Sequence, residues 1–454
     1  MKGFLVAGTA SGVGKTTVTL ALIAATRQRG LVVQPFKGGP DFLDTTHHTR
    51  ISGSTSRNLD TWMLTPEANR AVLSEASAGA DAVIVEGMMG LFDGKDGLTE
   101  TGSSAEIAKL LGLPVILVLD ASKSARSIAA VVLGFESFDL TLNLAGVILN
   151  RAASERHYQM LSTAIAASCR TPVLGWLPRD PAITIPERHL GLHAASEAPA
   201  TEVLSLFAEA AEAHLELDRI LALEFPLEAR QSTSSETKTD PIRIGVARDD
   251  AFSFYYEDNL DLLRNAGATI ISFSPLHDPH LPEDLDALYL GGGYPELHAE
   301  ALSANTSMHE NLRTFAAQGR PIYAECGGMI YLGRTLTTTD GEPHAMANLL
   351  DLAFEMTPKL NQFGYTTVEL TQSNLLGPAG TVIRGHSFHY SRLTSPAPQK
   401  TSYEVTYSLA SRKEPEGFTQ GNILASYIHL HFRANPTIAP HFVEAARTAR
   451  LVHA

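Results

Sequence analysis

The chain has 454 residues, enough for two or three domains that each bury a core of their own. Its apolar and charged fractions, 44% and 19%, are those of an ordinary globular protein. The formal net charge of −14 argues against nucleic acid or an anionic membrane as a partner, because both bind basic patches. No apolar run approaches the roughly 20 residues that span a bilayer, and the sequence opens directly on a strand, so we expect a cytoplasmic protein.

The first predicted elements are a strand, a glycine-rich turn and a helix. The turn, GTASGVGKTT at 8–17, follows apolar residues 4–7 and precedes the apolar helical residues 18–25. In such a turn backbone N–H groups converge on an anion, the lysine reaches the β- and γ-phosphates, and the first threonine hydroxyl binds Mg²⁺. The strict pattern has glycine where Thr9 stands. The motif predicts a nucleotide-phosphate site made by Gly12, Gly14, Lys15, Thr16 and Thr17.

Charged residues follow the next two predicted strands. After the strand at 31–33, Lys37, Asp41 and Asp44 lie in a loop at the strand's carboxyl end, where open α/β sheets bind ligands. A charged loop in water is the alternative interpretation. The strand at 81–87 contains Glu86 at its end, the position from which a carboxylate serves Mg²⁺ in P-loop proteins. The glycine-spaced loop after it carries Asp93.

Strands and helices continue to alternate through the first half of the chain. The predicted strands are 114–119, 144–149 and 172–177, and the predicted helices are 103–111, 127–134, 155–167 and 201–223. Unbroken apolar strands joined by helices predict a parallel sheet covered on both faces. Asn150 follows one of these strands, on the sheet edge expected to hold the phosphates.

A polar stretch divides the chain. Residues 231–240, QSTSSETKTD, contain no core-forming side chain and are typical of a linker. We predict a nucleotide-binding domain at 1–225, a linker at 226–240 and a second α/β domain at 241–454. In the second domain, strands at 242–247, 269–273 and 286–290 alternate with helices at 254–266 and 307–318.

The second domain contains a turn that resembles a nucleophile elbow. Cys326 stands where a strand becomes a helix, between Glu325 and Gly327-Gly328, so that its side chain is presented and its backbone N–H is left for an oxyanion. The other cysteine, Cys169, fits a structural role, and two cysteines make no disulfide framework. The turn predicts a thiol nucleophile at Cys326.

A thiol nucleophile needs a base. Residues 425–432, ASYIHLHF, alternate like a strand, which puts His429 and His431 on one face, and one of them would activate Cys326. An alternative interpretation groups them with His386 and His389 as a metal cluster. No cysteine or carboxylate stands at ligand spacing, which disfavours a metal there.

Four motifs together resemble a known family. They are GTASGVGKTT at 8–17, PFKGGPDFLD at 35–44, VEGMMGLFDG at 85–94 and ECGGM at 325–329. Their combination resembles the glutamine-dependent cobyrinate a,c-diamide synthases, corrin-ring amidases of cobalamin biosynthesis. The resemblance implies an α/β fold: a dethiobiotin-synthetase-like P-loop domain with a parallel sheet, then a flavodoxin-like class I glutamine amidotransferase domain. Thr9 in the turn is the form that this ATPase superfamily uses.

The resemblance also implies a mechanism and its cofactors. ATP with Mg²⁺ would phosphorylate the a and c carboxylates of cobyrinate in turn, and ammonia would displace phosphate from each acyl phosphate. The ammonia would come from L-glutamine, hydrolysed through a thioester on Cys326 with His429 as the catalytic histidine. The implied site residues are Lys15, Thr16, Thr17, Gly12, Gly14 and Asn150 for ATP, Thr16, Asp41 and Glu86 for the metal, Lys37, Asp44 and Asp93 for the substrate, and Gly292, Gly293 and Gly327 for glutamine and its oxyanion. A homodimer is left open.

Two departures accompany the resemblance. Class I amidotransferases generally have glutamate two residues after the catalytic histidine, where this chain has His431, so the third member of a triad is open. The nucleophile turn also begins with Ala324 where glycine is usual.

Three alternatives remain at this point. Hydrogenobyrinate, the metal-free corrin of the aerobic pathway, would use the same motifs. Cobyric acid synthase would carry Lys-x-Gln-Asn-Met where this chain has Lys37 to Asp41. A partitioning-type ATPase switch would have a second lysine at the position of Ala10 and would need no elbow cysteine.

Overall fold

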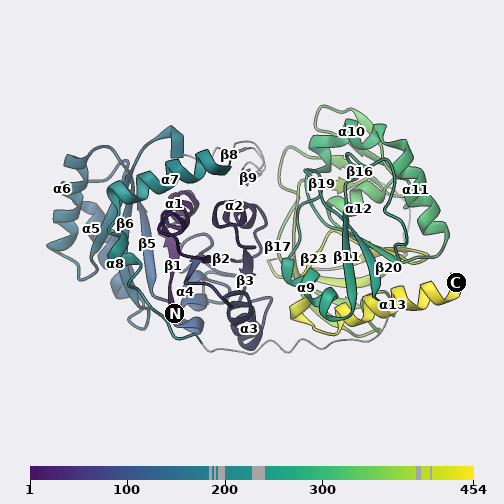
Figure 1. The fold of residues 1–454 in the computed structure, drawn as a ribbon, viewed down its shortest axis with the longest axis horizontal. Coiled ribbons are helices and arrows are strands. Elements are labelled where there is room, and N and C mark those ends of the chain that lie inside the picture. Colours follow the sequence, from purple (N-terminus) through teal and green to yellow (C-terminus); the bar gives the residue numbers. More distant parts are fainter. Residues whose placement is uncertain are drawn as a thin grey trace. The chain divides into compact units, whose positions relative to one another are not determined.

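The computed structural model describes residues 1–183, 187–188, 191–192, 200–227, 241–394, 400–409 and 412–453. The chain forms two compact units, Met1–Ser232 and Thr233–Ala454 (Figure 1). The division falls inside the predicted linker at 226–240, of which residues 228–240 lie outside the described part of the chain.

The first unit is a seven-stranded parallel sheet with strand order β3-β2-β4-β1-β5-β6-β7. Its strands are β1 (Lys2–Gly8), β2 (Val33–Gly38), β3 (Arg57–Leu59), β4 (Ala82–Glu86), β5 (Val115–Asp120), β6 (Leu144–Ala152) and β7 (Val173–Pro178). Its helices are α1 (Lys15–Gln28), α2 (Leu43–Ser52), α3 (Pro66–Ala76), α4 (Ser104–Leu111), α5 (Ser127–Phe138), α6 (Glu155–Ala166), α7 (Ala200–His214) and α8 (Leu217–Ile220). The predicted parallel sheet is confirmed.

Burial explains why these strands are apolar throughout. Strands β1, β4 and β5 are buried on both faces, as the unbroken apolar runs require. Helices α1, α7 and α8 pack on one face in a shared core (Figure 1). The central helix α1 has almost no polar face, and its residues from Val18 to Thr26 are all buried.

The predicted bounds of two elements in this unit were wrong. The second strand runs from Val33 to Gly38 instead of 31–33, so Lys37 is a buried strand residue and not part of a loop. The predicted helix at 201–223 is two helices, because the chain between them bridges to β7: Glu216 N donates to Leu174 O at 2.9 Å. After α8 the chain returns to the start of β1, where Gly3 N donates to Leu223 O and Phe225 N to Met1 O.

The second unit is built on a ten-stranded mixed sheet, in the order β11-β10-β12-β13-β22-β21-β20-β17-β18-β23. The first five strands are parallel: β11 (Ala268–Phe273), β10 (Ile242–Ala247), β12 (Ala287–Leu290), β13 (Ile322–Glu325) and β22 (Ile423–Ser426). The others pair antiparallel: β21 (Arg412–Gln420), β20 (Thr401–Tyr407), β17 (Gln362–Leu370), β18 (Val382–His389) and β23 (His429–Leu430).

Helices cover this sheet on two sides. Helices α10 (Ala299–Ala304), α11 (Thr306–Ala317) and α12 (Gly327–Leu332) share one core, and α9 (Glu257–Asn265) and α13 (Ile438–His453) share the other. A small second sheet contains β15 (Pro343–Ala345), β14 (Thr335–Thr337), β16 (Ala353–Met356) and β19 (Ser391–Leu393). Within the described residues, no helix combines the length and apolarity needed to span a membrane.

The predicted single strand at 425–432 was also wrong. Strand β22 ends at Ser426, and β23 begins at His429 and pairs with β18 instead of β13. The break is held by Glu416, whose carboxyl accepts hydrogen bonds from the Ser426 hydroxyl at 2.6 Å and from Tyr427 N at 2.7 Å. The break therefore places His429 on β23, the last strand of the order, whereas β22 lies in the middle of it.

Candidate nucleotide and amidotransferase sites

The glycine-rich turn between β1 and α1 has the backbone of a phosphate-binding loop. Gly12 and Gly14 have φ of 78° and 91°, in the left-handed region that favours glycine. Helix α1 begins at Lys15 with no side-chain cap, which leaves its first N–H groups available to an anion. A Cβ on Gly14 would lie 2.0 Å from Asn150 Nδ2, and that amide donates to Val13 O at 2.9 Å. Asn150, at the end of β6, thus contacts the turn directly.

Lys15 lies across this turn. Its Nζ donates to Met89 O at 2.6 Å and lies 3.4 Å from Ala10 O. Burial and the nearby charge of Lys37 lower the pKa of Lys15 to about 8, against the attraction of Glu86, Asp44 and Asp93. A nucleotide phosphate bound at the turn would stabilise the charged form of this buried ammonium and so raise its pKa.

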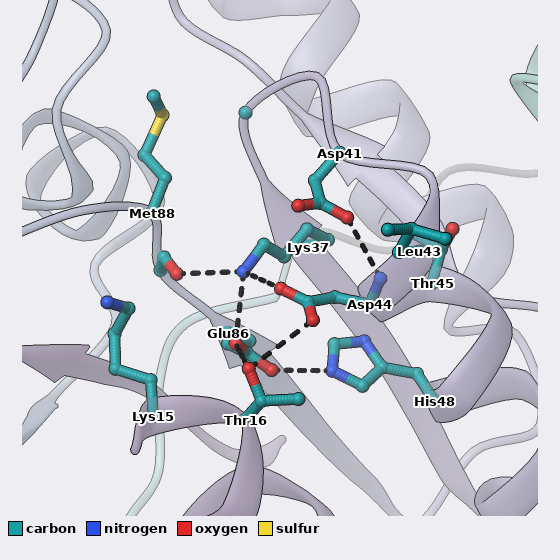
Figure 2. Close-up of polar contacts among 12 residues, drawn as sticks. Lys15, Thr16, Lys37, Asp41, Leu43, Asp44, Thr45, His48, Glu86 and Met88 are labelled. Atoms are coloured by element: carbon teal, nitrogen blue, oxygen red, sulfur yellow. Dashed lines mark hydrogen bonds and ion pairs between the residues drawn. The ribbon is translucent and has the colours of Figure 1, made fainter. Parts of the chain in front are cut away.

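A buried network of charges lies beside the turn, at the carboxyl ends of β2 and β4 (Figure 2). Lys37 Nζ is 2.5 Å from Asp44 Oδ2 and 3.0 Å from Glu86 Oε1. The Thr16 hydroxyl lies 2.7 Å from Glu86 Oε1 and 3.3 Å from Asp44 Oδ1. On the other side of Glu86, Oε2 is 2.7 Å from His48 Nε2. Two carboxyl groups and a hydroxyl therefore converge around one ammonium.

The electrostatics of this network favour an additional cation. The pKa of Lys37 is raised, because Asp44 and Glu86 outweigh the effect of burial. The pKa of Glu86 is lowered, because Lys37 and the hydrogen bond from His48 likewise outweigh burial. Burial and repulsion from Asp41 and Glu86 raise the pKa of Asp44 well above its usual value. A cation beside Asp44 and Glu86 would relieve that repulsion.

The donor atoms fit Mg²⁺ completed by phosphate oxygens and water. Mg²⁺ is usually held by one or two carboxylates together with substrate phosphates and waters, and Thr16, Asp44 and Glu86 offer oxygens only. In the described part of the chain, no group of three or more His, Cys, Asp or Glu side chains gathers as a preformed metal site.

Two of the predicted carboxylates have other contacts. Asp41 Oδ1 accepts from Asp44 N at 2.9 Å at the start of α2. Asp93 Oδ2 accepts from Gly90 N at 2.8 Å, which closes the turn of its own loop. Sequence reasoning missed His48, which is fully buried; its spacing of four residues from Asp44 on α2 was the available signal, because such residues share a helix face.

In the second unit, Cys326 lies at a sharp turn between β13 and α12. Its φ of 45° and ψ of −103° are unusual for a residue with a side chain. The prediction that its backbone N–H is left for an oxyanion was wrong, because this N–H donates to Ser426 O at 2.7 Å; the residue is 7% exposed. The other cysteine, Cys169, lies in the first unit, where its thiol donates to Ala129 O at 3.3 Å.

The glycines at the end of β12 pack directly against this turn. A Cβ on Gly327 would lie 3.0 Å from Gly293 N, and one on Gly292 would lie 2.5 Å from His429 Cε1. At Gly293 it would lie 1.9 Å from Ala251 O. These three positions therefore accept no side chain without displacement of a neighbour.

His429 is the imidazole beside Cys326. It is buried, and burial lowers its pKa, but the interactions with Cys326 and Glu325 outweigh that effect and raise the pKa to about 9. His386, on β18, stacks on the His429 ring at 4.9 Å. Cysteine hydrolases use a thiol and a neighbouring imidazole as nucleophile and base, so this pair offers the groups that such chemistry needs.

The other three histidines considered for a metal cluster, His386, His389 and His431, make contacts of their own. The ring of His431 packs 4.5 Å from that of Tyr256, and its Nδ1 lies 3.4 Å from Arg433 N. His386 Nδ1 is 2.9 Å from the Tyr256 hydroxyl, and His389 Nδ1 is 2.8 Å from Ser391 O. The rings of these three histidines are therefore engaged in hydrogen bonds or in stacking.

Comparison with known proteins covers both units. Residues 4–192 match the family model of the CobQ/CobB/MinD/ParA nucleotide binding domain. Residues 243–437 match that of the CobB/CobQ-like glutamine amidotransferase domain. Similar full-length proteins include those of Syntrophotalea carbinolica (46% identical), Salmonella typhimurium (44%) and Dehalococcoides mccartyi strain CBDB1 (43%). Each match covers 98% of both chains, and each of these proteins is named cobyrinate a,c-diamide synthase.

Proposed function

This chain belongs to the cobyrinate a,c-diamide synthase family, and we propose that it amidates the a and c carboxylates of cobyrinate with ATP and ammonia drawn from L-glutamine. As a member of that family it is a glutamine-dependent amidating ligase of cobalamin synthesis. One observation carries the finer proposal: a single chain contains both the Lys15–Thr16 phosphate turn and the Cys326–His429 pair.

The first unit would activate the corrin carboxylate. The N–H groups of the turn and Lys15 bind the ATP phosphates, and Asn150 supports the turn from β6. Thr16, Asp44 and Glu86 would hold Mg²⁺, which supplies positive charge to the phosphates when bound. Asp44 takes this role in preference to Asp41, because Asp44 contacts the Thr16 hydroxyl and Asp41 the start of α2.

Lys37 would serve the substrate. Its ammonium lies beside the two carboxyl groups that face Thr16, so it can pair with a third carboxylate or with the acyl phosphate made from it. Attack of the corrin carboxylate oxygen on the γ-phosphorus of ATP forms the acyl phosphate and releases ADP. Attack of ammonia on its carbonyl carbon then forms the amide and releases phosphate. Asp93 remains a candidate for positioning the corrin.

The second unit would supply the ammonia. The Cys326 sulfur attacks the side-chain carbonyl carbon of glutamine, and His429 donates a proton to the departing ammonia. The backbone N–H groups of Gly293 and Gly327 would stabilise the oxyanion. Water then cleaves the thioester, with His429 as base, and releases glutamate.

Replacing Cys326 separates the two halves of the reaction. We expect Cys326→Ala to abolish glutamine-dependent amidation while ammonia-dependent amidation persists, because the alanine removes only the nucleophile. The two rates are measured with glutamine or ammonium as nitrogen source. Loss of both rates in a folded variant would contradict this division.

Replacing Lys15 tests the other half. Lys15→Ala should stop both the glutamine- and the ammonia-dependent reactions, because acyl phosphate formation precedes either one. Ammonia-driven turnover at the wild-type rate would exclude the phosphate role of this turn.

Product mass spectrometry tests the substrate. Cobyrinate and hydrogenobyrinate are offered separately, each with ¹⁵N-amide glutamine and ATP. We expect two labelled amides on cobyrinate; four would indicate cobyric acid synthase chemistry, and product from hydrogenobyrinate alone would reassign the corrin. No amide on either would refute the proposal.

A further inference from the structure

We propose that Glu325 is the carboxyl group that orients His429 for proton transfer at Cys326. This proposal rests on the function proposed above, in which Cys326 and His429 hydrolyse glutamine. It fills the place left open by His431, which stands two residues after His429, where class I amidotransferases generally have glutamate.

The position of Glu325 in the fold favours this role. Glu325 is the last residue of β13 and directly precedes Cys326, and its side chain is 1% exposed. Its Oε2 lies 3.8 Å from His429 Nδ1, on the imidazole that also hydrogen-bonds with the Cys326 thiol. The carboxyl and the thiol therefore both interact with this imidazole, as the acid and the nucleophile of a triad do with its base.

The carboxyl group of Glu325 is also held in one orientation. Its Oε1 accepts from the Tyr323 hydroxyl at 2.7 Å and from Leu430 N at 3.1 Å. Its Oε2 accepts from the Tyr289 hydroxyl at 3.0 Å. Burial raises the pKa of both tyrosines well above the ordinary value, so they remain donors. Because Leu430 follows His429, Glu325 holds the main chain beside the imidazole as well as the ring.

The negative charge of Glu325 suits this role as well. A buried imidazolium is costly without a nearby anion, and Glu325 is the carboxyl that raises the pKa of His429 beside Cys326. His386 stacks on the same ring, but burial, then His429 and His431, keep its pKa well below the ordinary value. His389 is similarly neutral, with a pKa lowered to about 4 by burial. His431 cannot take the place of this anion, because an imidazole side chain carries no negative charge.

The test is Glu325→Gln in the full-length protein. The substitution keeps the shape of the side chain and removes its charge. We expect kcat for glutamine hydrolysis to fall about a hundredfold, with KM for glutamine within about threefold. Ammonia-dependent diamide synthesis should be unchanged.

A second readout distinguishes positioning from a structural role. In a Cys169→Ser background, the rate of Cys326 alkylation by iodoacetamide is followed against pH. Loss of the Glu325 charge makes the thiolate–imidazolium pair less stable, so the midpoint of this profile should move to higher pH. Asp286→Asn is the matched control: Asp286 is a buried carboxyl that accepts from Arg243 N at 2.8 Å, and its variant should keep the wild-type profile.

Wild-type kcat and an unshifted alkylation profile in Glu325→Gln would overturn the proposal. If Glu325→Gln does not fold, Glu325→Asp is measured instead; it withdraws the charge from His429 by one methylene, so kcat should fall, and an unchanged kcat counts against the assignment. Cys326→Ala keeps the outcomes distinct. Full glutamine-dependent activity in that variant refutes the proposed function itself, whereas its loss together with a wild-type Glu325→Gln refutes only the role of Glu325.

Discussion

At the scale of single residues, Lys37 shows how this chain tolerates charge in its interior. Its side chain is 5% exposed and lies between Asp44 and Glu86, themselves 7% and 0% exposed. Taking such groups out of water is costly, and their mutual attraction offsets that cost only while the set is complete. Lys37 thus holds together the two carboxyl groups that we assign to Mg²⁺.

The replacement Lys37→Met should therefore destabilise the first unit by about 3–5 kcal/mol in metal-free buffer, because it leaves buried carboxyl groups without their cation. Added Mg²⁺ should recover part of this loss. The measurement is urea unfolding of both proteins with and without Mg²⁺. Lys109→Met is the control: Lys109 pairs with Glu100 and Asp139 at the surface, and its loss should cost under about 1 kcal/mol. Equal stability of the two variants would contradict this view of Lys37.

At the scale of elements, the turn after β12 determines where His429 can lie. Gly292 faces the His429 ring so closely that a methyl group there would meet Cε1 at 2.5 Å. The ring has little room to retreat, because His386 is stacked on it. Glycine at residue 292 is therefore what allows His429 to lie where it does beside Cys326.

Gly292→Ala should reduce glutamine hydrolysis by roughly tenfold or more, since a small displacement of a catalytic group is costly. Ammonia-dependent synthesis should be retained. Both rates are measured on the same preparation, with Gly134→Ala as control, because a Cβ on Gly134 in α5 meets nothing within 4 Å. Parallel loss of both rates would indicate a folding defect in place of a displaced histidine.

The break between β22 and β23 depends on another buried acid, Glu416. Burial raises its pKa to about 7, from an ordinary value near 4.5. Between these two pH values the folded protein keeps a proton that the unfolded chain has released. Glu416 therefore makes the second unit less stable as the pH rises from about 4.5 to about 7, by up to roughly 3 kcal/mol.

Glu416→Gln should remove this slope. The free energy of unfolding is measured by denaturant titration at several pH values across that range. The readout is the difference in slope between wild type and variant, because the absolute stability also changes when an amide replaces the acceptor of Tyr427 N. An identical slope in the two proteins would show that Glu416 keeps an ordinary pKa.

Elements with local signals could be predicted from the sequence, and long-range contacts could not. The phosphate turn, the parallel strands and the cysteine turn each follow from residues adjacent in the chain. The pairing of β23 with β18, and the approach of Glu325 to His429, join segments distant in the sequence and carry no periodicity. The sequence placed Lys37 in a loop because Pro35 and two glycines in 34–39 are turn residues. The segment is nevertheless a strand, because it pairs with β3 and β4.

At the scale of the whole molecule, two units with separate cores carry the two proposed activities. Each unit is large enough to unfold as a cooperative transition of its own. A ligand stabilises only the part of a protein that binds it. The nucleotide should therefore raise the midpoint of one unfolding transition and leave the midpoint of the other unchanged.

Calorimetry tests this expectation. A non-hydrolysable ATP analogue with Mg²⁺ should raise the midpoint of one transition, with about 2.7 kcal/mol of stabilisation at a hundredfold excess over Kd. Lys15→Ala should abolish the shift, whereas Cys326→Ala should keep it. Equal shifts of both transitions, or a shift that survives Lys15→Ala, would be inconsistent with a nucleotide site at this turn.

The return of the chain to the start of β1 has a consequence for how such an enzyme can be assembled. Near the end of the described part of the first unit, Phe225 pairs with Met1 at the start of β1, whereas the phosphate turn lies at the far end of β1, about 20 Å away by strand length. A segment attached after residue 227 therefore begins near the start of β1, at the end of the sheet opposite the phosphate turn. A purification tag or a different module joined at that point would start at the other end of β1 from the phosphate turn, so we expect it to leave nucleotide binding unchanged.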